Sequence, residues 1–346
     1  MDVHSLDDFE RLAQATLSPE AFDYYAGGSW DERTLHENEA AFGRRLLYPR
    51  VLVDASRIDM STTVLGARVS LPVGFAPAAL QGLAHPEGEV VPARVAGREG
   101  LPYVLSTFSN RSLETVASVG RGVRWFQLYV QRDRGRSASL VERAAEAGYT
   151  ALVLTVDLPQ PGYRARELRR PVRDAGPLGN ILDVGPGGAP LDPVLLDNDA
   201  SLTWADLAWI RSLSAMPLVL KGILRPDDAQ LAVEHGAAAI VVSNHGGRQL
   251  DRVPATVDVL GPIVEAVAGR AEVYLDGGVR RGTDVVTALA LGARAVFIGR
   301  PFLYALAVAG EAGVARAVEI VRAETSLAMA LLGCPTVADI SRDRVS

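Results

Sequence analysis

The chain has 346 residues, of which 48% are hydrophobic and 22% charged, so the composition predicts a large buried core and argues against global disorder. Its net charge is −6, and no dense run of Lys or Arg is present, which argues against a nucleic-acid-binding protein. Cys334 is the only cysteine, so the sequence excludes an intrachain disulfide and a cysteine-based zinc cluster, and we expect no metal.

The N-terminal sequence, MDVHSLDDFERLAQATL, carries acidic residues where a signal peptide has a basic segment and an apolar core. No apolar run approaches the roughly 18 residues that a membrane-spanning helix needs. The single cysteine is typical of a reducing compartment. We therefore expect a cytoplasmic protein without a membrane partner.

Residues 1–70 begin with a helix-like segment, SLDDFERLAQATLSPEAFDYYAGG, and continue into a short extended segment. The length of the chain suits a single α/β barrel with insertions, although two domains are possible on length alone. We interpret residues 1–346 as one domain, in which residues 1–70 form an N-terminal cap.

Short apolar runs rich in β-branched residues follow this cap. Continuous apolar runs such as Ala239 to Val242 are typical of buried parallel strands, and the intervening segments have helical spacing and end at glycine. Eight such units predict a closed (β/α)8 TIM barrel over residues 71–310, with a doubly wound sheet as the alternative. The strands are expected to begin near Pro72, Tyr103, Arg124, Ala151, Pro217, Ala239, Glu272 and Ala295.

The interval from Ala151 to Pro217 is twice as long as the next longest, which indicates an insertion over residues 158–203, after the fourth strand. Residues 171–200 within it contain five Gly and five Pro and lack clear periodicity. Because this loop leaves the C-terminal face of the barrel, we interpret it as a mobile active-site lid, with a loop of no function as the alternative. Residues 311–346 are expected to form C-terminal helices.

The residues at the C-terminal ends of barrel strands converge on one mouth, where TIM-barrel active sites lie. The first four strands place there Pro77, Ala78, Ala79, Ser106, Phe108, Gln127, Tyr129, Thr155 and Asp157. The last four contribute Lys221, Ser243, His245, Arg248, Asp276, Gly277, Gly278, Arg280, Gly299 and Arg300. We predict that these residues form the active site.

The stretches LDGGVRRG and IGRP place paired glycines and arginines after the seventh and eighth strands. Free backbone amides, a helix N-terminus and a guanidinium together bind phosphate, and these strands are its usual position in such barrels. A phosphorylated cofactor or substrate is therefore implied, although two glycines near an arginine can also be an ordinary turn.

The segment SNHGGRQLD is the most informative. An imidazole at His245 has a pKa suited to accepting a hydroxyl proton, and the guanidinium of Arg248 suits a carboxylate. Asp157 could accept a hydrogen bond from this imidazole, or could instead cap a helix. The remaining histidines are interpreted as structural: His4, His36, His85 and His235.

Two further basic residues complete the prediction. Arg164 is expected to give a second carboxylate contact, with an exposed loop arginine as the alternative. Lys221 emerges from a buried strand, where an ammonium group needs a nearby anion.

The sequence resembles the FMN-dependent 2-hydroxy-acid oxidase family over nearly the whole chain. The resemblance is carried by a series of motifs in this order: DYYAGG, APAALQGLAHPEGE, WFQLYV, LTVD, LKGI, SNHGGRQLD, LDGGVRRGTDV and IGRP. That family includes glycolate oxidase, lactate oxidase, mandelate dehydrogenase and 4-hydroxymandelate oxidase. The resemblance implies FMN as the cofactor, oxidation of an (S)-2-hydroxy acid to the 2-oxo acid, reduction of dioxygen to hydrogen peroxide, and a homotetramer.

The resemblance also implies roles for individual residues. It places Tyr24, Phe108, Tyr129, Arg164, His245 and Arg248 at the substrate, with Asp157 supporting His245. Lys221 would stabilise the reduced flavin, and the other strand-end residues named above would bind the flavin ring, the ribityl chain or the phosphate. His245 would remove the hydroxyl proton as a hydride leaves the α-carbon, or would remove the α-proton first; both routes need the same base.

Three departures from the family bear on the substrate or on the lid. Phe108 stands where glycolate oxidase has tryptophan, so we expect a substrate bulkier than glycolate, such as a mandelate-, hydroxymandelate- or lactate-like acid. Tyr163 stands where many relatives have arginine, and the insertion is shorter than in glycolate oxidase, so the contacts of the lid are expected to differ.

Three alternatives remain open. The chain could be a dehydrogenase that passes electrons to a quinone or a protein. It could be an FMN-dependent isomerase or a nucleotide dehydrogenase, although Cys334 lies in the wrong region for the nucleophile of the latter. It could also be a silent flavin-binding protein, against which the retention of His245, Asp157, Arg164 and Arg248 argues.

Overall fold

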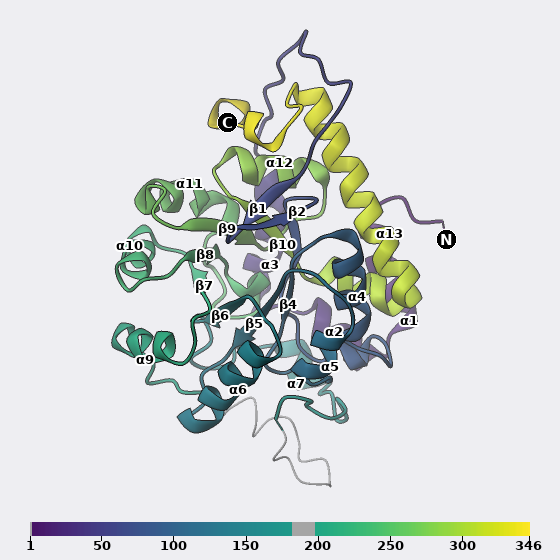
Figure 1. Ribbon diagram of the computed structural model, residues 1–346. Coiled ribbons are helices and arrows are strands. Elements are labelled where there is room, and N and C mark those ends of the chain that lie inside the picture. The colour runs from purple at the N-terminus through teal and green to yellow at the C-terminus, as the bar shows by residue number, and fades with distance from the viewer. Residues whose placement is uncertain (1, 182–197) are drawn as a thin grey trace.

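The computed structural model describes residues 2–181 and 198–346 (Figure 1). Eight parallel strands close into a barrel in the order β10-β3-β4-β5-β6-β7-β8-β9, which confirms the predicted (β/α)8 barrel and excludes the doubly wound sheet. The strands are β3 (Val73–Phe75), β4 (Tyr103–Leu105), β5 (Arg124–Leu128), β6 (Ala151–Thr155), β7 (Leu218–Ile223), β8 (Ala239–Val242), β9 (Glu272–Asp276) and β10 (Ala295–Ile298).

Six of these strands begin at the predicted residue. The other two, β3 and β7, begin one residue after Pro72 and Pro217. Proline has no backbone N–H to donate to a neighbouring strand, so regular pairing starts at the residue that follows it.

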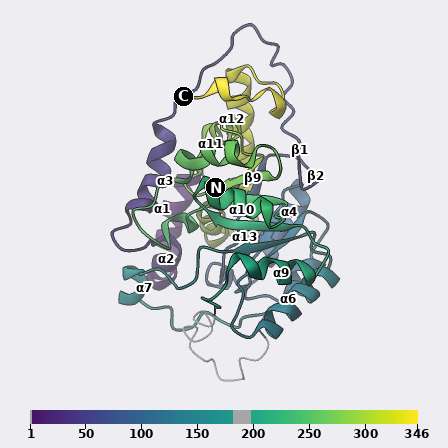
Figure 2. The ribbon, with the colours of Figure 1, turned by 90° about the vertical axis from the view of Figure 1, so that its left-hand side faces the viewer.

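An outer layer of helices covers the barrel (Figures 1 and 2). Each helix buries one apolar face; in α6 this face includes Leu140, Val141 and Ala144. The outer helices are α4 (Val90–Glu99), α5 (Leu113–Ser118), α6 (Arg134–Glu146), α9 (Leu207–Ser212), α10 (Pro226–Glu234), α11 (Thr256–Val267), α12 (Gly282–Ala290) and α13 (Arg300–Leu332).

The last helix, α13, contains a break. Ala309 and Gly310 have non-helical backbone angles, and Gly310 adopts a positive φ of 54°. The part beyond this break continues to Leu332 and is followed by two 3-10 turns, Val337–Asp339 and Arg342–Arg344. Helix α1 (Leu6–Thr16) packs along α13, as Figure 1 shows, so the first and the last α-helix lie side by side on one flank of the barrel.

The N-terminal segment contacts both ends of the barrel, where the sequence suggested a single cap. The hairpin of β1 (Thr62–Val64) and β2 (Ala67–Val69) packs Val64 and Val69 onto the layer that contains Trp125 and Tyr274 inside the barrel. The N–H of Leu65, in the turn of the hairpin, donates to Oε2 of Glu272, the first residue of β9, at 3.2 Å. The hairpin therefore covers the N-terminal ends of the strands.

Helices α2 (Pro19–Ala26) and α3 (Arg33–Gly43) lie at the opposite end. Asn38 of α3 exchanges two side-chain hydrogen bonds, at 2.9 and 2.7 Å, with Asn244, the second residue after β8. These helices consequently form one wall of the mouth at the C-terminal ends of the strands.

In its described part, the insertion after β6 contains one helix, α7 (Ala165–Arg169). Beyond it, Ala175, Leu178 and Ile181 are buried against Phe108 and Leu80. The predicted lid is therefore folded onto the mouth as far as residue 181, while its residues 182–197 lie outside the described residues. Among the residues that the structure describes, no helix has the length and apolar character needed to cross a membrane.

Candidate active site

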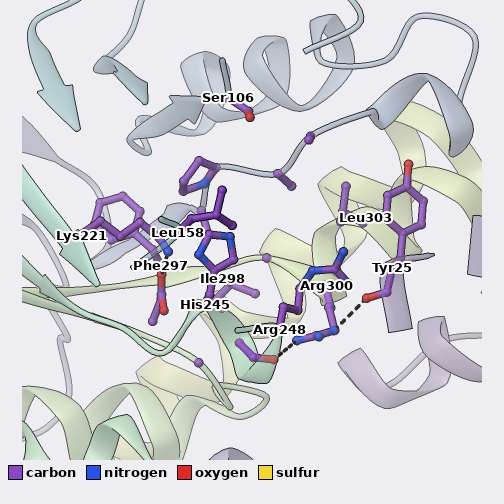
Figure 3. Close-up of a pocket in the computed structure, with 18 of the residues that line it drawn as sticks. Tyr25, Ser106, Leu158, Lys221, His245, Arg248, Phe297, Ile298, Arg300 and Leu303 are labelled. Carbon is purple, nitrogen blue, oxygen red and sulfur yellow. Dashed lines mark hydrogen bonds and ion pairs between the residues drawn. The ribbon is translucent and has the colours of Figure 1, made fainter. Parts of the chain in front are cut away.

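A pocket opens at the C-terminal rim of the barrel and is lined by residues from nearly every strand end (Figure 3). In this view, His245 lies between Lys221 on one side and Arg300 on the other. The predicted residues that line the pocket are Tyr24, Pro77, Ala78, Ala79, Ser106, Phe108, Tyr129, Arg164, Lys221, His245, Arg248, Asp276, Gly277, Gly278, Arg280, Gly299 and Arg300.

Four predicted residues lie directly behind this lining: Gln127, Thr155, Asp157 and Ser243. Gln127 accepts from Oγ of Ser106 at 3.3 Å and donates to Oγ1 of Thr155 at 3.0 Å. Ser243 accepts from Nζ of Lys221 at 2.9 Å. These side chains therefore position the lining residues by hydrogen bonds.

His245 is held by three contacts. Its Nδ1 lies 2.9 Å from Oδ1 of Asp157, its Nε2 lies 3.2 Å from the hydroxyl of Tyr129, and its backbone N–H donates to Oγ of Ser243 at 3.1 Å. Its φ is +58°, a left-handed conformation that costs a non-glycine residue about 1–3 kcal/mol and occurs at functional sites. The local backbone thus turns the imidazole into the pocket at an energetic cost that its contacts offset.

Burial lowers the pKa of His245, although the charge of Asp157 acts in the opposite direction. For Asp157 itself, burial acts to raise the pKa, but His245 and Lys221 outweigh it and leave the pKa low. The imidazole is therefore neutral near pH 7 beside a charged carboxylate, and Nε2 is free of the proton that Nδ1 shares with Asp157. No helix begins at Asp157, so the helix-cap alternative is wrong.

Lys221 is buried between two carboxylates. Its Nζ lies 3.3 Å from Oδ2 of Asp276, and burial, which would lower its pKa, is outweighed by Asp276 and Asp157, so the pKa is raised. The pairing of β7 with β8 shifts register at Gly222, where φ is +114°. Glycine is needed at this position, because a Cβ there would lie 2.6 Å from Cβ of Asp157. The ammonium group therefore remains charged inside the barrel.

Two guanidinium groups face the pocket from the other side. Arg248 donates to the carbonyls of Tyr24 and Gly27, at 2.5 and 3.0 Å, and lies over the ring of Tyr24. Arg164 donates from Nε to the carbonyl of Arg248 at 3.2 Å. Burial, followed by the charge of Arg248, lowers the pKa of Arg164, whose side chain is only 14% exposed, so the exposed-loop alternative is wrong.

Arginines and glycines after β9 and β10 form a second polar end. Arg300 donates to the carbonyls of Tyr25, Gly246 and Gly27 at 2.9 to 3.0 Å, and burial lowers its pKa to about 10. Arg280 is paired with Glu39 at 2.5 Å. Gly278 has a φ of +82°, and a Cβ there would lie 2.0 Å from the carbonyl of Asn38, so only glycine allows α3 to approach this closely.

The apolar wall of the pocket is formed around Phe108. Its ring stacks on that of Tyr129, with centroids 5.2 Å apart, and it belongs to a buried cluster with Leu80, Leu178 and Ile181. Burial raises the pKa of Tyr129 and of Tyr24, so both phenols keep their protons and can donate hydrogen bonds.

The other histidines lie outside the pocket. His4 is exposed and pairs with Asp2, His36 is exposed, and His235 stacks on Trp204. His85 accepts from the N–H of Glu87. Their positions agree with the structural interpretation.

Residues 13–346 match the FMN-dependent dehydrogenase family. The chain belongs to the FMN-dependent 2-hydroxy-acid oxidases. It is 52% identical to an L-lactate oxidase of Nostoc sp. over 97% of this chain and 96% of the relative, and 45% identical to glycolate oxidase of Spinacia oleracea over 100% and 96%. A crystal structure of mandelate oxidase superposes with a TM-score of 0.92 at 43% identity, over 99% of this chain and 98% of the other.

The cofactor of this FMN-dependent oxidase is FMN, and the pocket fits it. One end offers guanidinium groups and positive-φ glycines, which suit a phosphate. At the other end lie the charged Lys221 and an oxygen of Asp276, Oδ1, that is buried without a hydrogen-bond partner among the described residues. These groups suit the ribityl chain and the polar edge of a flavin.

Sequence reasoning missed several residues of the oxidase pocket. Tyr25 and Gly246 contribute through backbone carbonyls that bind Arg300, and a carbonyl leaves no trace in the residue type. Leu158, Pro161, Val279, Phe297, Ile298 and Leu303 add apolar lining. Glu167, which pairs with Arg164 and Arg248, was also missed, although an acid three residues after an arginine in a helix is a usable signal.

We predict that Arg300→Ala weakens FMN binding by roughly 10- to 100-fold, because hydrogen bonds to charged groups contribute about 1.5–3 kcal/mol. Arg300→Lys keeps the positive charge but lacks the forked donors of a guanidinium group, so it should lose less affinity for FMN than Arg300→Ala. Quenching of flavin fluorescence during titration of the apoprotein measures both. Equal affinity of the Ala variant and the wild type would contradict a role for Arg300 in binding the cofactor; Arg270→Ala, on the surface far from the pocket, is the control.

Proposed function

We propose that this oxidase converts an (S)-2-hydroxy acid bulkier than glycolate into the 2-oxo acid and reduces dioxygen to hydrogen peroxide. The observation that carries the proposal is the position of His245, whose Nε2 faces the pocket while Nδ1 is bonded to Asp157. A neutral buried imidazole, two guanidinium groups and a flavin pocket at one rim suit removal of a proton from a bound 2-hydroxy acid.

The protein's own groups divide the work. Arg164 and Arg248 bind the substrate carboxylate, and Tyr24 and Tyr129 donate hydrogen bonds from their protonated hydroxyls. Nε2 of His245 accepts the proton of the substrate hydroxyl. The imidazolium that results is stabilised by the charged carboxylate of Asp157 at 2.9 Å.

Bound FMN would supply the acceptor for the hydride equivalent that leaves the α-carbon. Arg280, Arg300 and the glycines at 277, 278 and 299 would hold its phosphate, and Lys221, fixed in its charged state, would stabilise negative charge on the reduced ring. Pro77, Ala78, Ala79, Ser106, Gln127, Thr155, Ser243 and Asp276 would contact or support the ring and the ribityl chain.

The substrate preference follows from the wall beside Tyr129. Phe108 lines the pocket with an apolar ring that offers no hydrogen-bond donor, and Leu80 and Leu178 pack against this ring from behind. Such a surface favours an aryl or alkyl group over the hydrogen of glycolate. Mandelate oxidase and L-lactate oxidase, to which this chain is similar, are named for acids with such groups.

Dioxygen is the proposed electron acceptor because the similar proteins are named oxidases. A dehydrogenase that reduces a quinone or a protein is the second candidate. A silent flavin-binding protein would have no use for the His245–Asp157 pair.

Anaerobic mixing of the FMN-loaded protein with (S)-mandelate, (S)-4-hydroxymandelate, (S)-lactate and glycolate tests the reaction. We expect the flavin absorbance near 450 nm, an approximate band position, to bleach fastest with the bulkier acids, and His245→Ala to retain FMN but not to bleach. Bleaching of His245→Ala at the wild-type rate would refute the base assignment. Readmitted air should restore the colour within seconds and yield peroxide; slow return would favour the dehydrogenase.

The pH dependence of kcat/KM tests the His245–Asp157 pair. His245 must be neutral to accept a proton. Because its pKa is lowered, we expect kcat/KM to fall only at a pH below 6.5, the ordinary pKa of histidine. Because the charge of Asp157 raises the pKa of His245, Asp157→Asn should move this acidic limb to still lower pH while kcat falls roughly 10- to 100-fold. Asp2→Asn, which alters the exposed pair with His4, is the control; a limb that moves to higher pH would contradict the assignment.

We further propose a homotetramer in the cytoplasm. The assembly is supported by a run of exposed apolar residues, in which Val51 is 81% and Leu52 fully exposed, beside Leu331 at 70%. The location is supported by a single, buried cysteine. Sedimentation velocity should give a mass near four times 36.8 kDa, and Leu52→Asp should reduce it; a monomeric wild type would contradict the proposal.

A further inference from the structure

Glu167 connects the two arginines proposed to bind the substrate carboxylate. It lies on α7, in the insertion after β6, and its side chain is 23% exposed. Its Oε1 accepts from Nη2 of Arg248 at 2.9 Å, and both of its oxygens lie 3.4 Å from Nη1 of Arg164. One carboxylate therefore pairs with both guanidinium groups.

Other donors of these arginines bind neutral acceptors. Nη1 of Arg248 binds the carbonyls of Tyr24 and Gly27, and Nη2 of Arg164 lies 3.3 Å from Oε1 of Gln249. Among the described residues, Glu167 is the only acidic side chain that forms an ion pair with either arginine. It is consequently the one group there that offsets their charge directly.

The electrostatics show why an offset is needed. Arg248 lowers the pKa of the buried Arg164, whereas Glu167 acts to raise it. Without Glu167, the two guanidinium groups would present two positive charges to a bound anion. With Glu167, the net charge of the three side chains is +1. A single substrate carboxylate then brings the cluster to neutrality, while a second carboxylate on the substrate would leave an excess negative charge in a poorly solvated site.

We propose that Glu167 is a specificity-determining and positioning residue: its charge makes the carboxylate site selective for 2-hydroxy acids with one carboxylate over those with two, and its hydrogen bonds hold Arg164 and Arg248 in place. The inference rests on the proposed function, because it takes these arginines as the carboxylate site. It narrows the substrate class to monocarboxylic 2-hydroxy acids.

The test uses product-like anions, so that binding is measured without turnover. Isothermal titration of the FMN-loaded enzyme compares 2-oxohexanoate, with one carboxylate, and 2-oxoglutarate, with two, at pH 7.5, where both are fully ionised. Wild type should bind 2-oxohexanoate more tightly. Glu167→Gln keeps an acceptor for Arg248 but removes the charge, and should shift the ratio of the two Kd values by about tenfold toward 2-oxoglutarate.

Two variants separate charge from position. Glu167→Asp keeps the charge on a shorter side chain, so it should keep the wild-type selectivity while binding both anions more weakly. Glu114→Gln removes a carboxylate that pairs with Arg143 on the surface, at 2.8 Å, and should change neither value. In each variant, the FMN absorbance verifies that the pocket is intact.

An unchanged Kd ratio in Glu167→Gln, or an equal shift in Glu167→Asp, would overturn the proposal. Failure of every 2-hydroxy acid to reduce the wild-type flavin would overturn the proposed function alone, since the titrations would still decide the role of Glu167. Binding of neither anion by the wild type would overturn the role of Glu167, while reduction of the flavin by a 2-hydroxy acid would still support the proposed function.

Discussion

The buried ammonium group of Lys221 is the constraint around which the mouth of the barrel is organised. A charge without solvent requires compensating charge nearby, and Asp276 and Asp157 supply it from the ends of two different strands. Their approach requires the glycine at position 222, because a side chain there would collide with Asp157. The register shift in β7 is therefore part of the site, because the charge pairs of Lys221 depend on the backbone geometry of the strand at Gly222.

The same carboxylates link this constraint to the base. Asp157 lies between the positive charge of Lys221 and the imidazole of His245, so it stays ionised despite its burial, and His245 stays neutral until it takes up a proton. The backbone strain at His245 serves this arrangement, since it directs the ring toward the pocket. Around this centre, Arg248 and Arg300 each bind backbone carbonyls of the N-terminal segment, so formation of the site depends on the docking of α2.

The barrel and most of its site could be predicted from the sequence because their signals are local. Continuous apolar runs located the strands to within one residue, and the strand ends then ordered the polar residues around one mouth. The missing parts depend on contacts between distant segments. Nothing near Lys221 in the chain indicates Asp276. The spacing of Glu167 from Arg164 could have indicated that pair, but nothing near Glu167 indicates its second partner, Arg248. The N-terminal segment reaches both rims, which its residue types do not reveal.

The packing of α1 along α13 has a consequence for how the protein is made. A ribosome releases Leu6 to Thr16 long before Arg300 to Leu332 exists, so the first helix must wait for almost the whole chain before it can bury its apolar face. The seam between β3 and β10 joins equally distant parts of the sequence. Closure of such long loops is slow, and the unfinished chain exposes strand edges in the meantime. The incomplete chain is therefore more prone to aggregation than the finished protein throughout its synthesis.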